Sequence, residues 1–504
     1  MASNSLVLGI DFGTTNTTAA WCDPAGKIHP VPTGRNTHVL PSTVWFGRKE
    51  RVLVGQPARE MAVDDPIHTV FGVKRFIGRR FASEYVARYK DRFAYPIVEG
   101  QAGLASVQVY GTVVPLNDIA FLILQRVLEL ANAAARTEFQ DCVLTVPAYY
   151  SYGHRRAIRT AAEMLGLDVR AVVNEPTAAA LYYAKHMEVS QTALIFDLGG
   201  GTFDATLLKV DRRTVKVLGN GGEAFLGGMD FDAAIVERLC ELFEKEHGVD
   251  LRSNPVVMQR LLFAAEVAKI ELTKEKTARI RIPFVTQTST GSLSVDHLLT
   301  REELEEITDR LVAHVVGLTE ETLVGANMSA DDVGEIVFVG GQSRMPAIQR
   351  QLSKRFRHDP KKNISPELGI AVGAAILGRT LNLARGPALT DVVPIPIGVM
   401  LPGGITQEVI PKNAAVPITE RLPIDTRPAA GQPLVIAVYE AMDPGSVHRE
   451  LLGTLQVQPD WLEANPGPID LEMRLGQDFD LTLAVISPTG KGMPLEMKPP
   501  RSAS

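Results

Sequence analysis

The chain has 504 residues, of which 45% are hydrophobic and 22% are charged, and its net charge is −6. This length predicts more than one domain, each large enough to bury its own core. The acidic balance gives no electrostatic reason to expect a nucleic-acid partner.

The three cysteines, Cys22, Cys142 and Cys240, lie far apart in the sequence. Their spacing indicates neither a disulfide framework nor a thiolate metal site. The first residues form no basic, apolar leader, and charged and polar side chains interrupt the longest apolar helical stretch, residues 119–135. We therefore expect a cytoplasmic protein that does not contact a membrane.

Short apolar runs alternate with helical segments along most of the chain. The runs with the length and β-branched content of buried strands are residues 6–11, 142–148, 193–200 and 335–341. The segments with a helical period are residues 155–167, 256–272 and 301–318. Thr300 and Glu303 form a capping box at the start of the last of these. This order predicts an α/β fold built on parallel strands, whose ligands gather beyond the carboxyl ends of the strands. The residues expected at those ends are Asp11, Pro147, Asp197 and Gly340.

Two glycine-rich turns carry an aspartate at the end of an apolar strand. They read "GIDFGTTN", with Asp11, and "FDLGGGTFD", with Asp197 and Asp204. Taken singly, each is more often a tight strand exit with a capping aspartate, but two copies predict similar halves facing each other across a cleft. Backbone N–H groups of such turns bind phosphate oxygens, while Mg²⁺ is held by one or two carboxylates. We expect Asp11 and Asp197 to hold hydrated Mg²⁺ between the halves.

A third glycine site reads "VFVGGQSRMPAIQRQL" and lies where a strand is expected to join a helix. Gly340 and Gly341 permit close approach of a flat ligand, and Arg344 can lie against an adenine face. A simple strand-to-helix turn explains this site about as well.

The composition changes near the end of the chain. Proline-rich sequence and short alternating runs, such as residues 432–441 and 478–487, predict a separate antiparallel β domain. The expected boundaries are 1–384 for the nucleotide-binding domain, 385–391 for a linker, 392–497 for the β domain and 498–504 for a disordered tail.

The order of nine motifs closely resembles the ATPase domain of heat-shock protein 70 (DnaK-type) chaperones. The motifs are "GIDFGTTN", "VKRFIGRRF", "TVPAYYS", "NEPTAAALYY", "FDLGGGTFD", "LGGMDFD", "EVAKIEL", "VGGQSRMP" and "AVGAAILG". A weaker match continues through "DVVPIPIG" and "PKNAAVPI". The resemblance implies an actin-like, duplicated ribonuclease H-like ATPase domain with two lobes around a nucleotide cleft, followed by a small antiparallel β-sandwich.

The resemblance also implies roles for particular residues. The implied catalytic residues are Lys74, Glu175, Asp197, Thr202 and Asp204. Those implied to bind ATP or ADP are Gly13, Thr14, Thr15, Asn16, Gly199, Gly200, Gly201, Gly227, Gly228, Glu266, Lys269, Thr273, Gly340, Gly341, Arg344 and Glu367. Asp11 and Asp197 would bind Mg²⁺ through water, and K⁺ is a further implied ion. Pro147, Arg155 and Asp391 are implied in signalling between domains, and Val399, Ile424, Leu434 and Ile436 in lining a peptide pocket.

Several positions depart from the family pattern. Asn16 replaces a tyrosine or similar residue, Glu367 replaces an aspartate, and Ala171 fills the position of the arginine that docks a J-domain. Pro402 and Arg427 replace the two residues that usually arch over the peptide. The family's leucine-rich linker is here "GPALT", residues 386–390, from which we expect weak coupling between domains. The chain stops soon after its last strand-like run, so we expect no helical lid.

The favoured function is an ATP-dependent chaperone that binds unfolded or extended polypeptide, with a J-domain co-chaperone and a nucleotide-exchange factor as partners. The alternative is a filament-forming or regulatory actin-like ATPase without peptide binding, which "NEPTAAALYY" and the β domain disfavour. A sugar or acetate kinase on the same fold is a third alternative, disfavoured because no small-substrate motif is visible.

Overall fold

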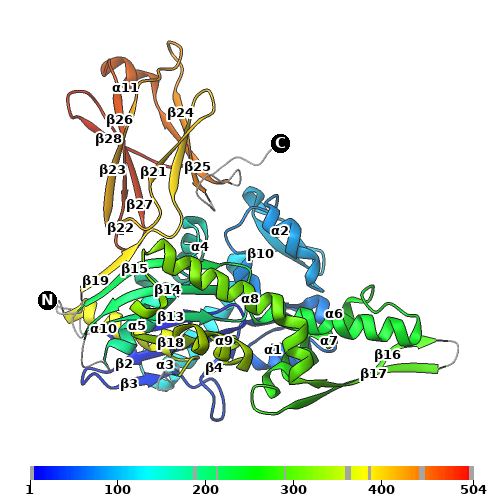
Figure 1. Cartoon of the computed structure of the whole chain (residues 1–504). Helices are drawn as coiled ribbons and strands as arrows, with labels where there is room; N and C mark the ends of the chain where they lie inside the picture. Colours follow the sequence, from blue (N-terminus) through cyan, green and yellow to red (C-terminus); the bar gives the residue numbers. More distant parts are fainter. Residues whose placement is uncertain are drawn as a thin grey trace.

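A computed structural model describes residues 5–185, 190–211, 214–288, 291–357, 365–383, 388–441 and 449–498. Two lobes form the body of the molecule, and a β-sandwich stands on one side of them (Figure 1). Each lobe contains a mixed sheet covered by helices on both faces, and the sandwich contains two antiparallel sheets.

The sheet of the first lobe has the strand order β12-β11-β1-β2-β3, with β4 paired to β2. Helices α3 and α4 pack on one face, and α10 packs on the other. The elements are β1 (Val7–Phe12), β2 (Asn16–Cys22), β3 (Ile28–Pro30), β4 (Val39–Pro41), β11 (Asp141–Val146), β12 (Asp168–Asn174), α3 (Leu116–Ala135) and α4 (Tyr152–Glu163).

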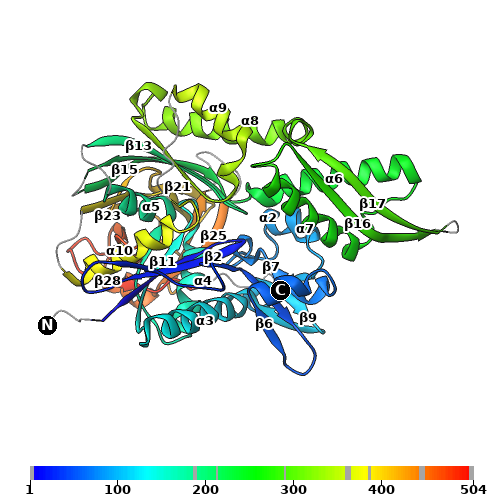
Figure 2. The same ribbon diagram turned by 90° about the horizontal axis from the view of Figure 1, so that it is seen from below.

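The sheet of the second lobe repeats this plan, with the strand order β18-β13-β14-β15-β19-β22. Helices α8 and α9 cover one face, while α6 and α7 pack against each other farther out (Figure 2). The elements are β13 (Gln191–Leu198), β14 (Phe203–Val210), β15 (Thr214–Glu223), β18 (Glu335–Val339), β19 (Ala388–Val392), β22 (Ala415–Val416), α6 (Gly228–His247), α7 (Pro255–Glu271), α8 (Arg301–Gly325) and α9 (Pro346–Phe356).

The α/β class is as expected, but the expectation of a parallel sheet is wrong in part. β1 pairs in parallel with β11, but it pairs antiparallel with β2, and β13 likewise pairs antiparallel with β14. Each Asp-Gly turn therefore closes a hairpin, because it is too short to carry the crossover helix that a parallel connection needs. The turn at Asp11 places Asp11 opposite Thr18, and the second turn places Asp197 opposite Asp204.

Helices α5 (Glu175–Ala184) and α10 (Gly369–Leu383) lie between the two central sheets. Their backbones approach so closely that a Cβ on Gly373 would lie 1.7 Å from the carbonyl oxygen of Ala178. A Cβ on Gly9 of β1 would lie 2.2 Å from the backbone nitrogen of Ala375. Glycine is required at these crossings because no side chain fits between the backbones.

Smaller elements extend each lobe away from the central sheets. In the first lobe they are α1 (Gln56–Met61), α2 (Glu84–Tyr89), β5 (Thr43–Phe46), β6 (Val52–Val54), β7 (Thr69–Phe71), β8 (Ile97–Glu99), β9 (Ala105–Val109) and β10 (Thr112–Pro115). In the second lobe the long hairpin of β16 (Thr277–Thr288) and β17 (Gly291–Thr300) projects outward (Figure 1). Short 3₁₀ turns cover Pro66–His68, Val73–Arg75, Lys90–Arg92, Gln101–Gly103, Ala330–Asp332 and Gln342–Arg344.

The start of α8 confirms half of the expected capping box. Thr300 Oγ1 accepts a hydrogen bond of 3.0 Å from the backbone nitrogen of Glu303. The Glu303 carboxylate instead contacts Arg238 at 3.2 Å and His297 at 2.9 Å. The hydroxyl cap therefore forms, while the carboxylate binds cationic and imidazole partners on neighbouring elements.

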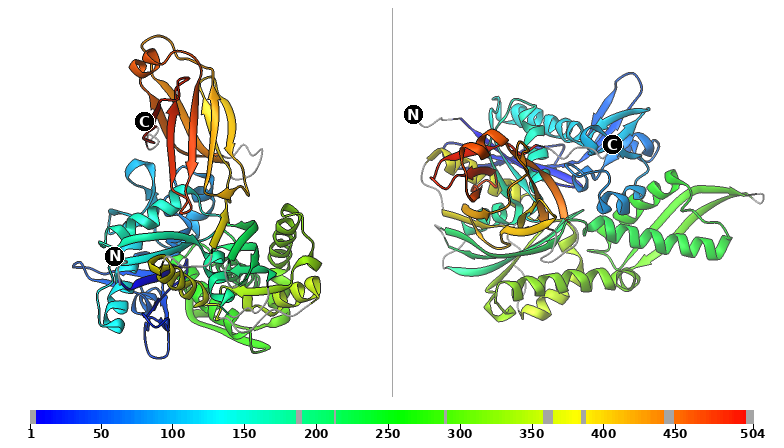
Figure 3. Two further views of the ribbon diagram at one scale, coloured as in Figure 1. Left: turned by 90° about the vertical axis from the view of Figure 1, so that its left-hand side faces the viewer. Right: turned by 90° about the horizontal axis from the view of Figure 1, so that it is seen from above.

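The β-sandwich consists of the sheets β21-β20-β24-β25 and β23-β26-β27-β28 (Figure 3). Its elements are β20 (Ile397–Leu401), β21 (Ile405–Ile410), β23 (Ile418–Ile424), β24 (Leu434–Ala441), β25 (Arg449–Val457), α11 (Pro459–Ala464), β26 (Ile469–Leu475), β27 (Leu481–Ile486) and β28 (Gly492–Leu495). Lys498, which we expected in a disordered tail, exchanges two backbone hydrogen bonds of 2.9 Å with Thr454. This pairing satisfies backbone groups of β25, an outer strand of its sheet.

In the part of the chain that the structure describes, no helix has the length and apolar character needed to span a lipid bilayer.

Candidate functional site

A cleft of about 400 Å³ opens between the two lobes. The β1–β2 turn and the β13–β14 turn form its floor, and α7 and the turn at residues 340–345 form its far wall. The expected site residues that line it are Asp11, Gly13, Thr14, Thr15, Asn16, Lys74, Glu175, Asp197, Gly199, Gly200, Thr202, Gly228, Glu266, Lys269, Thr273, Gly340, Gly341, Arg344 and Glu367. Asp204 is buried behind this lining, with its carboxylate accepting a hydrogen bond from the backbone nitrogen of Tyr149 at 3.3 Å. Gly201 and Gly227 also lie outside the lining.

Acidic side chains and one lysine meet at the floor of the cleft. Lys74 Nζ donates to Glu175 Oε1 at 2.6 Å, and both side chains are buried. Burial, followed by the charge of Glu175, raises the pKa of Asp11 to about 7. The same two causes, in that order, raise the pKa of Asp197 well above its usual range and that of Asp204 to about 7.

These pKa values indicate a shortage of positive charge around the carboxylates. Lys74 faces Asp11, Glu175, Asp197 and Asp204 in a region screened from water. Asp197 Oδ2 has no hydrogen-bond partner among the described residues. Buried carboxylates normally have a proton, a cation or a donor beside them, so the geometry fits a bound cation.

The two glycine-rich turns touch each other at the centre of the floor. A Cβ on Gly200 would lie 1.9 Å from Thr15 Oγ1, and a Cβ on Gly201 would lie 2.4 Å from Thr14 Cγ2. The carbonyl oxygens of Gly199 and Gly200 accept hydrogen bonds of 2.9 Å from the backbone nitrogens of Gly228 and Met229. Only glycine at positions 200 and 201 permits the two turns to touch. The contact between the turns holds the backbone of both against the cleft.

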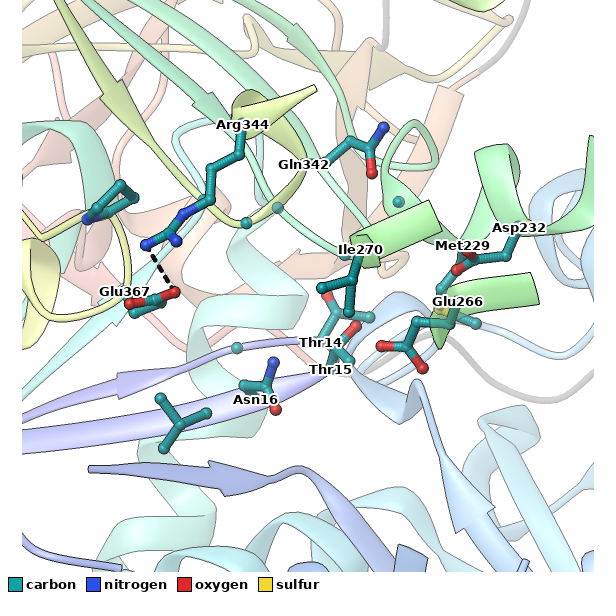
Figure 4. Close-up of a pocket in the computed structure, with 18 of the residues that line it drawn as sticks. Thr14, Thr15, Asn16, Met229, Asp232, Glu266, Ile270, Gln342, Arg344 and Glu367 are labelled. Atoms are coloured by element: carbon teal, nitrogen blue, oxygen red, sulfur yellow. Dashed lines mark ion pairs between the residues drawn. The ribbon is translucent and has the colours of Figure 1, made fainter. Parts of the chain in front are cut away.

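Charged side chains frame the other end of the cleft (Figure 4). Arg344 and Glu367 form an ion pair of 2.8 Å at one side of the opening. On the other side, Lys269 Nζ contacts Asp232 Oδ1 at 2.8 Å and the carbonyl oxygen of Gly228 at 2.8 Å. The Thr273 hydroxyl donates to the carbonyl oxygen of Ile270 at 2.7 Å. The lysine and threonine thus already have partners within the protein.

The structure adds residues that the sequence did not single out. Arg59 of α1 forms an ion pair of 2.5 Å with Glu266 of α7, across the cleft and 207 positions away in the sequence. No local motif marks Arg59. Asp232 stands inside the motif "LGGMDFD", and its spacing from the glycines was the available signal. Gln342 and Met229 also line the cleft.

Two of the three expected coupling residues, Arg155 and Asp391, contact the same side chain, Asn174, where β19 joins the second lobe. β19 pairs in parallel with β15, so Leu389 lies opposite Val215. Asp391 Oδ2 accepts hydrogen bonds of 2.9 Å from Asn174 and Thr177, and Arg155 donates to Asn174 Oδ1 at 2.6 Å. Pro147 directly follows β11 and is buried. Its carbonyl oxygen accepts a hydrogen bond of 3.1 Å from the backbone nitrogen of Tyr150. Gly386 and Pro387 of the linker lie outside the described residues.

The four expected peptide-pocket residues are fully buried in the sandwich core. Val399, Ile424, Leu434 and Ile436 are each 0% exposed, so they form no open groove in this conformation. Arg427, which replaces one of the residues that usually arch over the peptide in the family, donates to the carbonyl oxygens of Leu462 at 3.2 Å and Asn465 at 2.9 Å, and to that of Gly467. A guanidinium group has several donors and binds the free carbonyls at the end of α11 in preference to solvent.

The two lobes, the paired Asp-Gly hairpins and the central cleft define an actin-like ATPase joined to a β-sandwich. The chain belongs to the heat-shock protein 70 family, because the family model described as "Hsp70 protein" matches residues 7–466. It is 33% identical over 502 residues to the chaperone protein DnaK of Buchnera aphidicola subsp. Schizaphis graminum (strain Sg). That match covers 98% of this chain and 78% of the relative. The expected family, fold class and nucleotide-dependent activity are confirmed.

Proposed function

We propose that the protein is an ATP-dependent chaperone in which the nucleotide in the cleft sets how the β-sandwich holds unfolded or extended polypeptide. One observation carries this proposal. The α5 segment that presents Glu175 to Lys74 at 2.6 Å also holds Asp391 of the linker strand through Thr177. A change at the cleft floor and a change at the linker therefore act on the same helical turn.

Asp11 and Asp197 are proposed to hold a hydrated Mg²⁺, and Asp204 with Thr202 to face K⁺. The unpartnered Asp197 Oδ2 and the raised pKa values of all three aspartates support this assignment. Among the described residues, no group of three or more histidine, cysteine or acidic side chains is arranged to bind a metal directly. Two carboxylates with water and phosphate completing the shell are the arrangement typical of Mg²⁺. A bound divalent ion supplies charge neutralisation for the polyphosphate.

The chain's own residues then bind and orient the nucleotide. The backbone N–H groups of residues 13–15 and 199–202 are proposed to bind phosphate oxygens. Lys74 is proposed to orient the attacking water and to neutralise charge on the γ-phosphate, since its ammonium is fixed by Glu175 at the cleft floor. Glu266 and Lys269 are assigned to the ribose, and Arg344, Glu367 and Thr273 to the adenine end.

The polypeptide site is proposed around Val399, Ile424, Leu434 and Ile436. These side chains are closed within the core, so binding requires the loop of residues 425–433 to move. A J-domain co-chaperone and a nucleotide-exchange factor are proposed as further partners. Three free cysteines, all buried, fit a reducing compartment, and we propose the cytoplasm.

Domain boundaries are proposed at 1–384, 385–391 and 392–498, with Lys498 moved from the expected tail of 498–504 into the β domain because it pairs with Thr454. Helix α10 ends at Leu383 and strand β19 begins at Ala388, which supports a junction between them. β19 extends the sheet of the second lobe, so the linker in this conformation is part of the ATPase body.

The deciding experiment measures the affinity of the full chain for a labelled unfolded peptide with saturating ATP and with saturating ADP. A several-fold difference between the two nucleotides is the expected result. Equal affinities, or no binding in either state, would count against a chaperone cycle. Sedimentation with ATP tests the alternative of a filament-forming ATPase, which predicts pelleting polymer.

A further inference from the structure

A glutamate of the β-sandwich is buried where the sandwich meets the ATPase domain. Glu440 lies near the end of β24 and is 4% exposed. Both of its carboxylate oxygens accept a hydrogen bond from the backbone nitrogen of Tyr152, at 2.9 Å and 3.2 Å. Tyr152 is the first residue of α4, so this contact joins the two domains at a helix N-terminus.

The groups that face Glu440 come from β25, β20 and α4 and from the turn that carries Arg79. On β25, Glu450 is its direct cross-strand partner, and on β20 the opposite residue is the apolar Ile397. From the ATPase domain, Arg79 approaches Glu450 at 3.5 Å, and Arg155 of α4 is buried against the ring of Phe479 at 4.3 Å. The phenol of Tyr152 lies on the same helix as Arg155. Two carboxylates of the sandwich are thus placed opposite each other at a closed interface.

His154 is the imidazole closest to this cluster along α4. Burial and the charges of Arg79 and Arg155 lower its pKa well below the usual range. It therefore stays neutral around physiological pH and contributes no proton exchange there.

Burial outweighs the groups that favour the charged form of Glu440. The hydrogen bond from Tyr152, the helix N-terminus and the two arginines all stabilise a carboxylate. Loss of water around the side chain is the larger effect, and with the charge of Glu450 it raises the pKa of Glu440 from 4.5 to about 8. When the sandwich undocks, the side chain returns to water and loses its proton at neutral pH.

We propose that docking of the β-sandwich onto the ATPase domain is linked to binding of one proton by Glu440, which makes this interface a pH-sensitive switch. The docked state has the higher proton affinity, so docking weakens as pH rises between the undocked and docked pKa values. In this range the docking equilibrium constant falls by at most about tenfold per pH unit, and it levels off above the pKa of Glu440 in the docked state. Between pH 6 and pH 7.5 the docking equilibrium should fall by about 25-fold. The proposal concerns docking alone and does not depend on polypeptide binding.

The test uses the full chain with fluorophores on two exposed positions, Glu138→Cys on the ATPase domain and Gln432→Cys on the sandwich. The natural cysteines are buried, which permits selective labelling. Energy transfer between the dyes reports the docked fraction. It is measured from about pH 6.0 to about pH 8.5, a range that includes the docked pKa of Glu440. At each pH the nucleotide concentration is varied to obtain the midpoint of docking. A pH-indicator dye counts protons taken up when docking is induced, and this readout works even where docking is complete.

Glu440→Gln should dock at every pH tested and take up no proton, because the amide resembles the protonated acid. Glu408→Gln, an exposed change on β21 of the same sandwich, should behave like the unaltered protein. Glu450→Gln removes the opposing charge and should move the transition to lower pH, which provides a second test if Glu440→Gln folds poorly. A flat pH profile in the unaltered chain, or an unchanged profile in Glu440→Gln, would overturn the proposal. Loss of the pH dependence in Asp391→Asn alone would assign the proton to the linker aspartate instead.

Discussion

Thr177 donates a hydrogen bond of 2.9 Å to Asp391 Oδ2, and this contact ties the linker strand to the first turn of α5. The same turn begins with Glu175, which accepts from Lys74 at the floor of the cleft. The side chains of Thr177 and Glu175 are buried, so solvent weakens neither the contact with Asp391 nor the contact with Lys74. A shift of this one turn changes the cleft and the linker together, which is the requirement for coupling two sites through a shared element.

Thr177→Val should loosen the linker without disturbing the cleft. The change keeps the shape of the side chain but removes one of the two side-chain donors on a buried carboxylate oxygen, at a cost of about 1–3 kcal/mol. Amide hydrogen exchange in β19 should accelerate by about 5- to 150-fold. Thr308→Val is a matched control, because that buried threonine donates within α8 to Leu304 at 2.6 Å. Equal acceleration in both variants would show that the effect is general destabilisation.

Lys74→Ala should leave nucleotide binding nearly intact and abolish turnover. The ammonium is proposed to act on the γ-phosphate and water, while the backbone turns and the charged opening hold the rest of the nucleotide. Calorimetry measures binding, and single-turnover hydrolysis measures the chemical step. Hydrolysis at the unaltered rate in this variant would remove Lys74 from the mechanism.

Asp197→Asn should reduce the dependence of ATP binding on Mg²⁺. Removing one of two proposed metal carboxylates should weaken Mg-ATP affinity by about 10- to 100-fold, while binding of metal-free ATP changes less. Titrations with Mg²⁺ and with a chelator compare the two directly. If both affinities fall equally, Asp197 positions the β13–β14 turn and does not bind the cation.

The sequence predicted the cleft floor well because its residues lie in contiguous turns. Asp11 and Asp197 each follow a buried strand, so the geometry of one turn fixes the place of each carboxylate. Contacts between distant segments carried no such signal. Arg59 meets Glu266 over 207 positions, and Tyr152 meets Glu440 over 288, and no motif contains Arg59 or Glu440.

The expected peptide pocket of the β-sandwich stays a prediction, because the sequence alone does not distinguish a pocket from a core. Apolar character at Val399 or Leu434 fits a peptide pocket and a closed core equally well, because both environments exclude water. Arg427 stands where the family usually has a residue that arches over the peptide, and here the free carbonyls at the end of α11 bind it. Which partner a guanidinium group meets depends on loop conformation, and the local sequence does not fix that conformation.

Gly373→Ala should strongly destabilise the ATPase domain. The added Cβ would lie 1.7 Å from the Ala178 carbonyl oxygen, so α5 and α10 must separate, at a cost of about 3 kcal/mol or more. Gly317→Ala in α8 is the matched control, because nothing lies within 4 Å of its Cβ position. There alanine should stabilise the helix by up to about 1 kcal/mol. Urea denaturation of both variants measures the difference, and equal stabilities would contradict the close α5–α10 contact.

The linker "GPALT" led us to expect weak coupling, since alanine, proline and threonine bury less apolar surface than leucine. The structure gives a different expectation, because β19 docks by pairing its backbone with β15 and with β22. Backbone pairing depends little on side-chain size. Leu389→Ala should therefore retain most of the coupling, with a loss below about 1.5 kcal/mol for a partly buried side chain.

Thr390→Pro should abolish coupling, because proline removes a backbone donor and disturbs strand geometry beside Lys216. Thr390→Ala keeps the donor and is the control. The measurement is the rate of steady-state ATP hydrolysis with and without saturating unfolded peptide. A fragment that ends at about residue 385 lacks the linker strand and the β domain and is measured in parallel as the uncoupled reference. Peptide stimulation that survives in Leu389→Ala and Thr390→Ala but disappears in Thr390→Pro supports docking through the backbone. If Leu389→Ala loses stimulation as fully as Thr390→Pro, the side chain carries the signal and the original expectation from the sequence is the better one.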